Sequence, residues 1–254
     1  MTTWILLRGL TRESGHWGDF TGQFQRALPG SRGVMLDLPG NGRLHRQPSP
    51  WRVQDMVASC RLELAARGIE PPYHLLAMSL GAMVAVEWGH AHPREIAASV
   101  LINTSLRPFS RFDQRLQPRN YGTLLKLALP GATSEAWERA ILRMTSNLAT
   151  AAVLPGWVAL RQASPVSRAN ALRQLAAAAR YRAPDTRPQA PTLVLASRQD
   201  HLVSVECSLA LARHWHCAIR LHPSAGHDLP LDDGPWVTAQ VRTWLAELAG
   251  AGSP

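Results

Sequence analysis

Short runs, most of them continuously apolar, alternate with helical patterns along most of the chain, and this alternation constrains the fold more than any other feature. The apolar runs span residues 4–7, 33–36, 74–78, 98–102, 192–196 and 218–222. Helical patterns lie between and after them, at residues 17–28, 53–67, 80–92, 205–214 and 235–248. Strands that are covered on both faces of a parallel sheet are apolar throughout, whereas half-exposed strands alternate. The order therefore predicts an α/β fold with a mostly parallel, doubly wound sheet.

The alternation stops between residues 107 and 185. This segment shows helical patterns at 121–129, 134–148 and 165–181, separated by Pro and Gly, and no convincing strand. We therefore predict a core formed by residues 1–106 and 186–254, with residues 107–185 inserted as an all-helical cap. A chain of 254 residues is long enough for one such domain with an insertion.

Composition narrows the class of protein. No run reaches the about 18 consecutive apolar residues of a membrane helix, and the N-terminal segment lacks the features of a signal peptide. Cys60, Cys207 and Cys217 are an odd number without metal-ligand spacing, so we expect neither a disulfide framework nor a zinc site. These observations predict a cytoplasmic protein that does not enter the membrane.

Ser79 lies where an apolar run turns sharply into a helical pattern, in the segment Leu-Leu-Ala-Met-Ser-Leu-Gly-Ala-Met of residues 75–83. Such a turn presents a serine hydroxyl at the end of a strand, and it needs small residues at the minus-two and plus-two positions. Ala77 and Gly81 occupy these positions. The pattern predicts a nucleophilic serine, although a small residue at the start of a helix would look the same.

Two further chemical groups follow strands in the second half of the chain. Asp200 follows the strand predicted at 192–196, and His227 follows the strand at 218–222. A serine hydroxyl needs a neutral imidazole to take its proton, and that imidazole needs a carboxylate to orient it. Backbone N–H groups must also stabilise the oxyanion, and we expect these from Leu80 and Leu10. The predicted catalytic residues are therefore Ser79, Asp200 and His227.

Together these marks resemble the α/β-hydrolase superfamily over essentially the whole chain. They are Leu6-Leu7-Arg8-Gly9, the run Asp37-Leu38-Pro39-Gly40-Asn41-Gly42, the Ser79 turn, the Asp200 loop and Ala225-Gly226-His227. The compact cap is most similar to small carboxylesterases, including the branch of the pimeloyl-carrier-protein methyl ester esterase. The resemblance implies an α/β-hydrolase fold, with the triad in the order Ser, Asp, His, and an enzyme that uses neither metal nor cofactor. It also implies a small-molecule ester as substrate.

Two positions depart from the family pattern. Ala77 replaces the first glycine of the turn, which adds only one methyl group, and Arg8 replaces the histidine before the oxyanion-loop glycine. Two roles are open for Arg8. It braces the loop through its forked donors, which we favour, or it places positive charge beside an acidic substrate.

The excess charge is concentrated in the predicted cap. Residues 107–185 carry twelve basic and four acidic side chains, which is +8 of the +9 of the whole chain. Such a surface fits an acidic carrier protein or acidic small substrates, but a solvated surface in an arginine-rich protein looks the same. The segment lacks the aromatic interleaving of nucleic-acid-binding surfaces, so we expect no nucleic-acid partner.

The favoured function is a carboxylesterase, present as a monomer or a homodimer. Two alternatives stay open at this point. A carbon–carbon bond hydrolase of ring-cleavage products would use the same triad, and a non-catalytic binding protein would keep the fold alone. The intact set of three side chains argues against the second alternative.

Overall fold

The computed structural model describes residues 1–128 and 131–251. All six predicted strands are present. They are β1 (Thr2–Leu7), β2 (Ser31–Leu36), β3 (Tyr73–Met78), β4 (Ile96–Ile102), β5 (Thr192–Ser197) and β6 (Ala218–His222). They form one sheet in the order β2-β1-β3-β4-β5-β6, and every neighbouring pair is parallel. The predicted doubly wound α/β architecture is confirmed.

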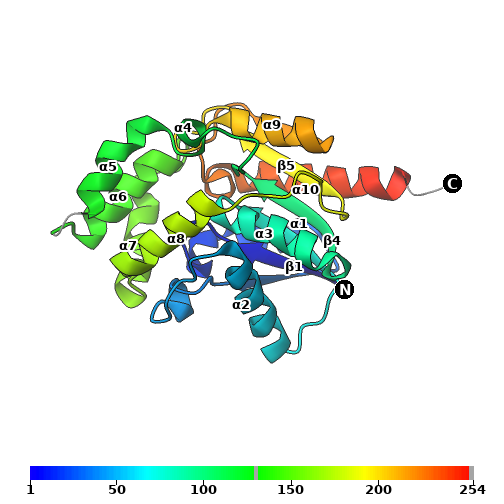
Figure 1. Ribbon diagram of the computed structural model, residues 1–254, viewed down its shortest axis with the longest axis horizontal. Helices are drawn as coiled ribbons and strands as arrows, with labels where there is room; N and C mark the ends of the chain where they lie inside the picture. Colours follow the sequence, from blue (N-terminus) through cyan, green and yellow to red (C-terminus); the bar gives the residue numbers. More distant parts are fainter. Residues whose placement is uncertain (129–130, 252–254) are drawn as a thin grey trace.

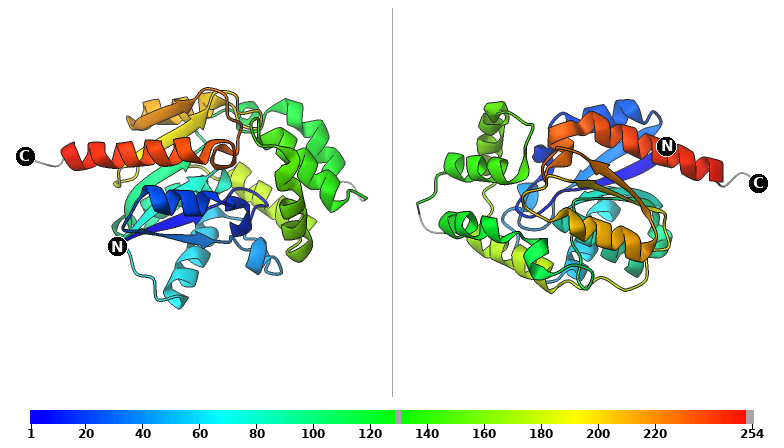
Figure 2. Two further views of the ribbon diagram at one scale, coloured as in Figure 1. Left: turned by 180° about the vertical axis from the view of Figure 1, so that it is seen from behind. Right: turned by 90° about the horizontal axis from the view of Figure 1, so that it is seen from above.

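Helices cover both faces of this sheet. Those outside the insertion are α1 (Phe20–Ala27), α2 (Val53–Ala66), α3 (Leu80–Ala91), α9 (Val205–Trp215) and α10 (Leu229–Ala251). Successive strand residues point to opposite faces, so Ile5 and Leu7 pack with α2, α3 and α9, while Trp4 and Leu6 pack with α1 and α10. Figure 2 shows α1 and α10 together on one face. Burial on both faces explains why the inner strands β1, β3, β4 and β5 are mostly apolar, whereas the edge strands β2 and β6 keep exposed or half-buried positions.

The segment 107–185 contributes no strand to the six-stranded sheet in the part of the chain that is described. Its helices are α4 (Phe112–Arg115), α5 (Tyr121–Ala128), α6 (Ser134–Thr145), α7 (Leu154–Ala163) and α8 (Arg168–Arg180). The chain enters and leaves this segment side by side, because Ala183 N donates to Arg107 O at 2.7 Å. Figure 1 shows α5 to α8 gathered at the end of the molecule toward which the strands run. We call residues 107–185 the cap segment.

Several predicted boundaries differ from the structure. The helix predicted at 17–28 begins at Phe20, after a short 3-10 turn, and the helix predicted at 134–148 ends at Thr145. Helices α4 and α7 were not predicted, and Leu129 of the helix predicted at 121–129 lies outside the described residues. Within the described ranges, none of the helices combines the length and the apolar character that a membrane span requires.

Candidate functional site

Ser79 occupies the turn between β3 and α3 with φ 53° and ψ −119°. This left-handed backbone is unusual for a residue with a side chain, and such strain is concentrated at functional sites. The turn is held by its own backbone, since Ser79 N donates to Ile102 O at 3.0 Å and Ala82 N donates to Ser79 O at 3.1 Å. The hydroxyl-bearing side chain is partly exposed. The structure therefore presents Ser79 in the way that the turn pattern predicts.

The close packing of strand β1 explains why a glycine stands two positions after Ser79. A Cβ atom built on Gly81 would lie 2.6 Å from the carbonyl oxygens of both Leu7 and Arg8. Strand β1 and helix α3 therefore approach too closely for any side chain at this position. Ala77 on the other side of the turn is fully buried.

His227 and Asp200 form a buried pair at the ends of β6 and β5. The distance from His227 Nδ1 to Asp200 Oδ2 is 2.7 Å, and the two residues are 4% and 5% exposed. The other carboxylate oxygen accepts hydrogen bonds from Leu202 N at 2.8 Å and Val203 N at 2.9 Å. An acceptor at Nδ1 favours the tautomer with its proton on Nδ1, which leaves Nε2 as the basic nitrogen. The buried carboxylate of Asp200 thus fixes the orientation of the His227 ring.

Asn103 and Thr104, which follow β4, connect the serine turn with the histidine loop. Asn103 Nδ2 donates to His227 O at 2.8 Å, and Thr104 Oγ1 donates to Ser79 O at 3.3 Å. Asn103 also accepts from Ser197 N at 2.9 Å. Two consecutive residues thus hold the segments after β3, β5 and β6 around one strand end. Sequence reasoning missed Asn103, whose only signal is a polar residue directly after a buried strand.

The predicted oxyanion donors lie on the two segments beside Ser79. Leu80 begins α3, where the first N–H groups have no acceptor within the helix. Leu10 follows Gly9, and a Cβ atom on Gly9 would lie 3.0 Å from Ser79 Cβ and 3.5 Å from Ser79 Oγ. The loop after β1 therefore passes directly beside the serine.

The same loop is tied to the cap segment. Thr11 N donates to Gln174 Oε1 on α8 at 2.8 Å, and Gln174 Nε2 donates to Asn41 Oδ1 at 2.8 Å. Asn41 Nδ2 in turn donates to Arg12 O at 2.9 Å, which connects the network back to the loop after β1. Because Gln174 and Asn41 are fully buried, this polar network fixes α8 against the loop.

Arg8 is buried, at 3% exposure, and does not point into solvent. Its two terminal nitrogens donate to Asp228 Oδ1 at 3.0 Å and Oδ2 at 2.5 Å. The guanidinium also lies 4.9 Å from the ring centre of Trp17. This geometry favours the bracing role over direct contact with an acidic substrate.

Further buried charges connect the loop after β1 with the cap segment. Arg12 Nη1 lies 2.5 Å from Glu138 Oε2 on α6, and Arg12 Nη1 is also 2.9 Å from His16 Nε2. Burial, and then the positive charge of Arg12, lower the pKa of His16, so its ring is neutral. Burial and the nearby Asp37 carboxylate raise the pKa of Glu13 to about 7.

Gly226 is required by the cap segment rather than by a left-handed backbone. A Cβ atom there would lie 2.7 Å from Thr145 O and 3.0 Å from Ser146 Cα, at the end of α6. Asn147 Nδ2 donates to the backbone oxygens of Gln199 and Ser224, from the loops that carry Asp200 and His227. The cap segment therefore presses directly on the histidine loop.

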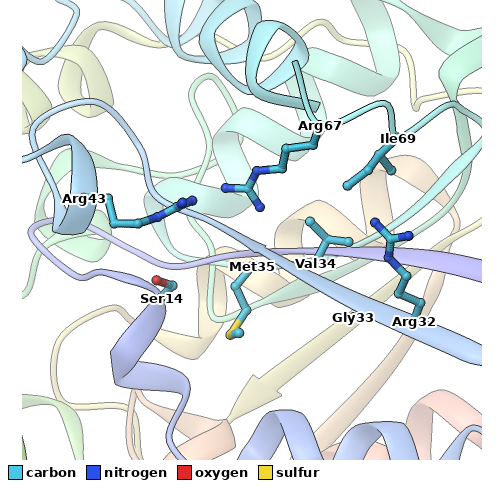
Figure 3. Close-up of a pocket in the computed structure, with 8 residues that line it drawn as sticks. All are labelled: Ser14, Arg32, Gly33, Val34, Met35, Arg43, Arg67 and Ile69. Atoms are coloured by element: carbon cyan, nitrogen blue, oxygen red, sulfur yellow. The ribbon is translucent and has the colours of Figure 1, made fainter. Parts of the chain in front are cut away.

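The described residues contain no group of three or more His, Cys, Asp or Glu side chains placed to hold a metal ion. That no metal or cofactor is used stays a prediction. A groove of about 440 Å³ runs along the edge strand β2, where Arg43 and Arg67 converge because both bind Glu63 (Figure 3). Its lining contains none of the predicted site residues. The lining residues are Ser14, Arg32, Gly33, Val34, Met35, Arg43, Arg67 and Ile69.

Comparison with known proteins decides the family. A family model described as the alpha/beta hydrolase family matches residues 4–240. The chain belongs to the alpha/beta hydrolase family. Membership supports hydrolase activity, whereas the finer likeness to the pimeloyl-carrier-protein branch stays a prediction.

Two sequence relatives carry the provisional name carbamate hydrolase RutD. The one from Variovorax paradoxus (strain S110) is 28% identical, and the match covers 98% of this chain and 94% of the relative. The one from Cronobacter turicensis is also 28% identical, over 88% of this chain and 83% of the relative.

Solved structures show the same fold. A thermophilic esterase from Thermogutta terrifontis has a TM-score of 0.74 at 20% identity, covering 97% of this chain and 90% of that one. The esterase RhEst1 from Rhodococcus sp. ECU1013 has a TM-score of 0.72 at 20% identity, covering 96% and 90%. At such identity these neighbours establish the architecture of this hydrolase and leave its substrate open.

Proposed function

We propose that this hydrolase is a carboxylesterase that cleaves small or medium acyl esters through an acyl-enzyme on Ser79. The observation that carries the proposal is the buried pair of His227 and Asp200, 2.7 Å apart, at the same sheet edge as a serine with φ 53°. The strained turn exposes the hydroxyl of a serine, and an oriented imidazole activates it by taking its proton.

The chemical steps follow from these positions. Ser79 Oγ attacks the ester carbonyl carbon while its proton passes to His227 Nε2, and Asp200 stabilises the imidazolium. The carbonyl oxygen becomes an oxyanion beside the N–H groups of Leu10 and Leu80, the latter at the positive end of α3. The bond to the alkoxy group breaks, and that group leaves with the proton from His227. A water molecule then attacks the acyl carbon and gives its proton to His227 Nε2. The bond from that carbon to Ser79 Oγ breaks, Oγ takes the proton from His227, and the acid is released.

A fluorophosphonate probe tests the nucleophile. The wild-type protein should gain one adduct, located on Ser79 by peptide mass spectrometry, and Ser79→Ala should gain none. Ser59→Ala on α2 serves as the matched control, because this hydroxyl bonds only its own helix at Asp55 O. An unlabelled wild-type protein, or an adduct on another serine, would contradict the proposal.

A carbamate is the second candidate substrate, because both sequence relatives are named as carbamate hydrolases. The same steps would give a carbamoyl-enzyme, whose nitrogen reduces the reactivity of the carbonyl toward water. Matched nitrophenyl esters and nitrophenyl carbamates separate the two. An esterase turns over the ester and stalls on the carbamate after one burst of nitrophenol, whereas a carbamate hydrolase turns over both.

The dependence of kcat/KM on ionic strength tests whether the positive charge of the cap segment attracts substrates. If acidic substrates or an acidic carrier protein are attracted by this surface, kcat/KM for an acidic ester falls as ionic strength rises, while a neutral ester is unaffected. A flat profile for both esters would reject electrostatic attraction and leave the charge as a solvated surface.

A further inference from the structure

Arg8 and Asp228 join the two loops that the proposed reaction must hold together. Arg8 directly precedes the loop of Gly9 and Leu10, and Asp228 directly follows His227. The two hydrogen bonds between their side chains, at 3.0 and 2.5 Å, are buried and connect positions 220 residues apart. We propose that this ion pair is a positioning pair, which fixes the His227 imidazole relative to the oxyanion donor at Leu10. The inference rests on the proposed function.

Both ends of the pair are anchored. Asp228 N donates to Thr145 O at 2.6 Å, and Asp228 O accepts from Leu231 N and Asp232 N at 3.0 Å as α10 begins. On the other side, the carbonyl oxygen of Arg8 packs against Gly81, at 2.6 Å from where a Cβ atom would lie. A two-bond fork between anchored residues restricts both distance and angle. A change in either anchor must therefore move the base or the oxyanion loop.

Stability alone does not account for the pair. Two charges removed from water cost about as much free energy as their attraction returns, so apolar residues of similar size often replace such pairs without loss. In addition, Arg8 Nε is buried and has no hydrogen-bond partner among the described residues. A buried guanidinium with an unbonded nitrogen adds little to the stability of the fold. It does fix the relative position of the two loops, because its two terminal nitrogens fit a carboxylate in one orientation.

The pair is also the innermost part of a longer connection. Arg12, four residues after Arg8, pairs with Glu138 on α6 of the cap segment. Asp228 on the histidine loop pairs with Arg8, and Glu138 on the cap segment pairs with Arg12, so the loop after β1 contributes the positive partner of both ion pairs. Arg8 therefore orients the base through Asp228 without contacting the substrate.

The relative position of the two loops affects the rate, because the transition state needs a group from each of them. His227 Nε2 and the N–H of Leu10 must converge on the same carbonyl group, from different loops. A displacement of about 1 Å from productive geometry costs on the order of a hundredfold in rate. Loss of the pair should consequently lower kcat and leave substrate binding nearly unchanged.

The test uses a double variant in the full-length protein. Arg8→Met with Asp228→Leu removes both charges and keeps the volume, whereas either single change leaves an unpaired buried charge that threatens folding. We expect kcat to fall about tenfold to a hundredfold, with KM within about threefold of wild type and an unchanged urea midpoint. Fluorophosphonate labelling of Ser79 should slow by the same factor. Arg8→Lys keeps one charged donor group, so its kcat should lie between that of the wild type and that of the double variant.

The control is Arg220→Met with Glu247→Leu, which removes an ion pair of 2.9 Å between β6 and α10. It should keep the kcat of the wild type. A double variant of Arg8 and Asp228 that also keeps wild-type kcat would overturn the proposal. If the wild-type protein is not labelled, the proposed function fails instead. In that case a crystal structure of the double variant decides the positioning role, and an unchanged placement of Leu10 relative to His227 would refute it.

Discussion

Replacing Gly9 by alanine should damage catalysis more than folding. The new methyl carbon would lie 3.0 Å from Ser79 Cβ and 3.5 Å from Ser79 Oγ. Carbon atoms pack best at about 3.5–4.0 Å, so Ser79 or the loop must move by roughly half an ångström or more. The backbone of Gly9 lies outside the left-handed region, so alanine is conformationally allowed and the substitution tests space alone.

The size of the effect follows from what moves. In the proposed reaction Ser79 carries the nucleophile and Leu10 carries one oxyanion donor, so either displacement changes the geometry of attack. A shift of this size should cost about tenfold or somewhat more in kcat, and the extra methyl group should cost about 1–3 kcal/mol of stability. Steady-state kinetics on a nitrophenyl ester and urea unfolding measure the two quantities.

Gly81 and Gly122 are the matched comparisons. At Gly81 a methyl group would lie 2.6 Å from two backbone oxygens, so Gly81→Ala should fail to fold or lose most of its stability. At Gly122, on α5, a methyl group meets nothing within 4 Å, and Gly122→Ala should gain about 0.5–1 kcal/mol with full activity. If Gly9→Ala keeps kcat within twofold of wild type, the loop does not press on Ser79 and the reasoning is refuted.

Three further changes test the site and its surroundings. Asp200→Asn should lower kcat by about 10⁴ with little change in KM, because His227 loses the acceptor that sets its tautomer; a loss below tenfold, from the same kinetics, would contradict this. Glu13 has its pKa raised to about 7, so the folded state holds its proton more tightly and stability should fall as pH rises from about 4.5 to 7. Because the carboxyl is only partly buried, the loss should be small, and Glu13→Gln should flatten that part of a pH series of urea midpoints. Gly42→Ala should be strongly destabilising, because Gly42 has φ 49° and a Cβ atom would lie 2.4 Å from Asp37 Oδ2; thermal unfolding measures it, and an unchanged midpoint would refute the clash.

The sheet could be predicted from the sequence because its signal is local. A strand buried on both faces must be largely apolar, and most of the six strands showed this within their own residues. Their parallel order then places the segments after β3, β5 and β6 at one edge. This is why the order of the chain alone could predict that Ser79, Asp200 and His227 follow strands at the same edge.

Helix α7 could not be predicted in the same way. Its first turn contains Pro155 and Gly156, which in sequence indicate a break. Proline is tolerated there because the first residues of a helix have no acceptor for their N–H groups. Helix α10 misleads in the opposite direction, since it begins at Leu229 and changes direction at Asp233, whose φ of −150° is not helical. Asp233 then accepts from Trp236 N, so the predicted start at Pro235 is that of a second helical segment.

The contacts that hold the site together were beyond sequence reasoning because they are long-range. Asp228 binds Arg8 from 220 residues away, and Gln174 on α8 reaches Thr11 across 163 residues. Nothing local distinguishes Asp228 from Asp232 or Asp233. Asp232 in turn accepts from Gly226 N at 2.6 Å, so three neighbouring carboxylates have three different partners. Only the folded chain assigns them.

Two arginines of the basic cap segment have a structural role that leaves their positive charge in place. Arg115 donates to the carbonyl oxygens of Ala178 and Ala179, and Arg107 also donates to Ala179, at the C-terminal end of α8. Helix ends leave these carbonyls unpaired, and positive charge is favourable there, so both arginines have a structural reason. Carbonyl groups are neutral, however, and leave the charge uncompensated. The field around the cap segment therefore persists even where its arginines are bound, and attraction of acidic substrates does not require free side chains.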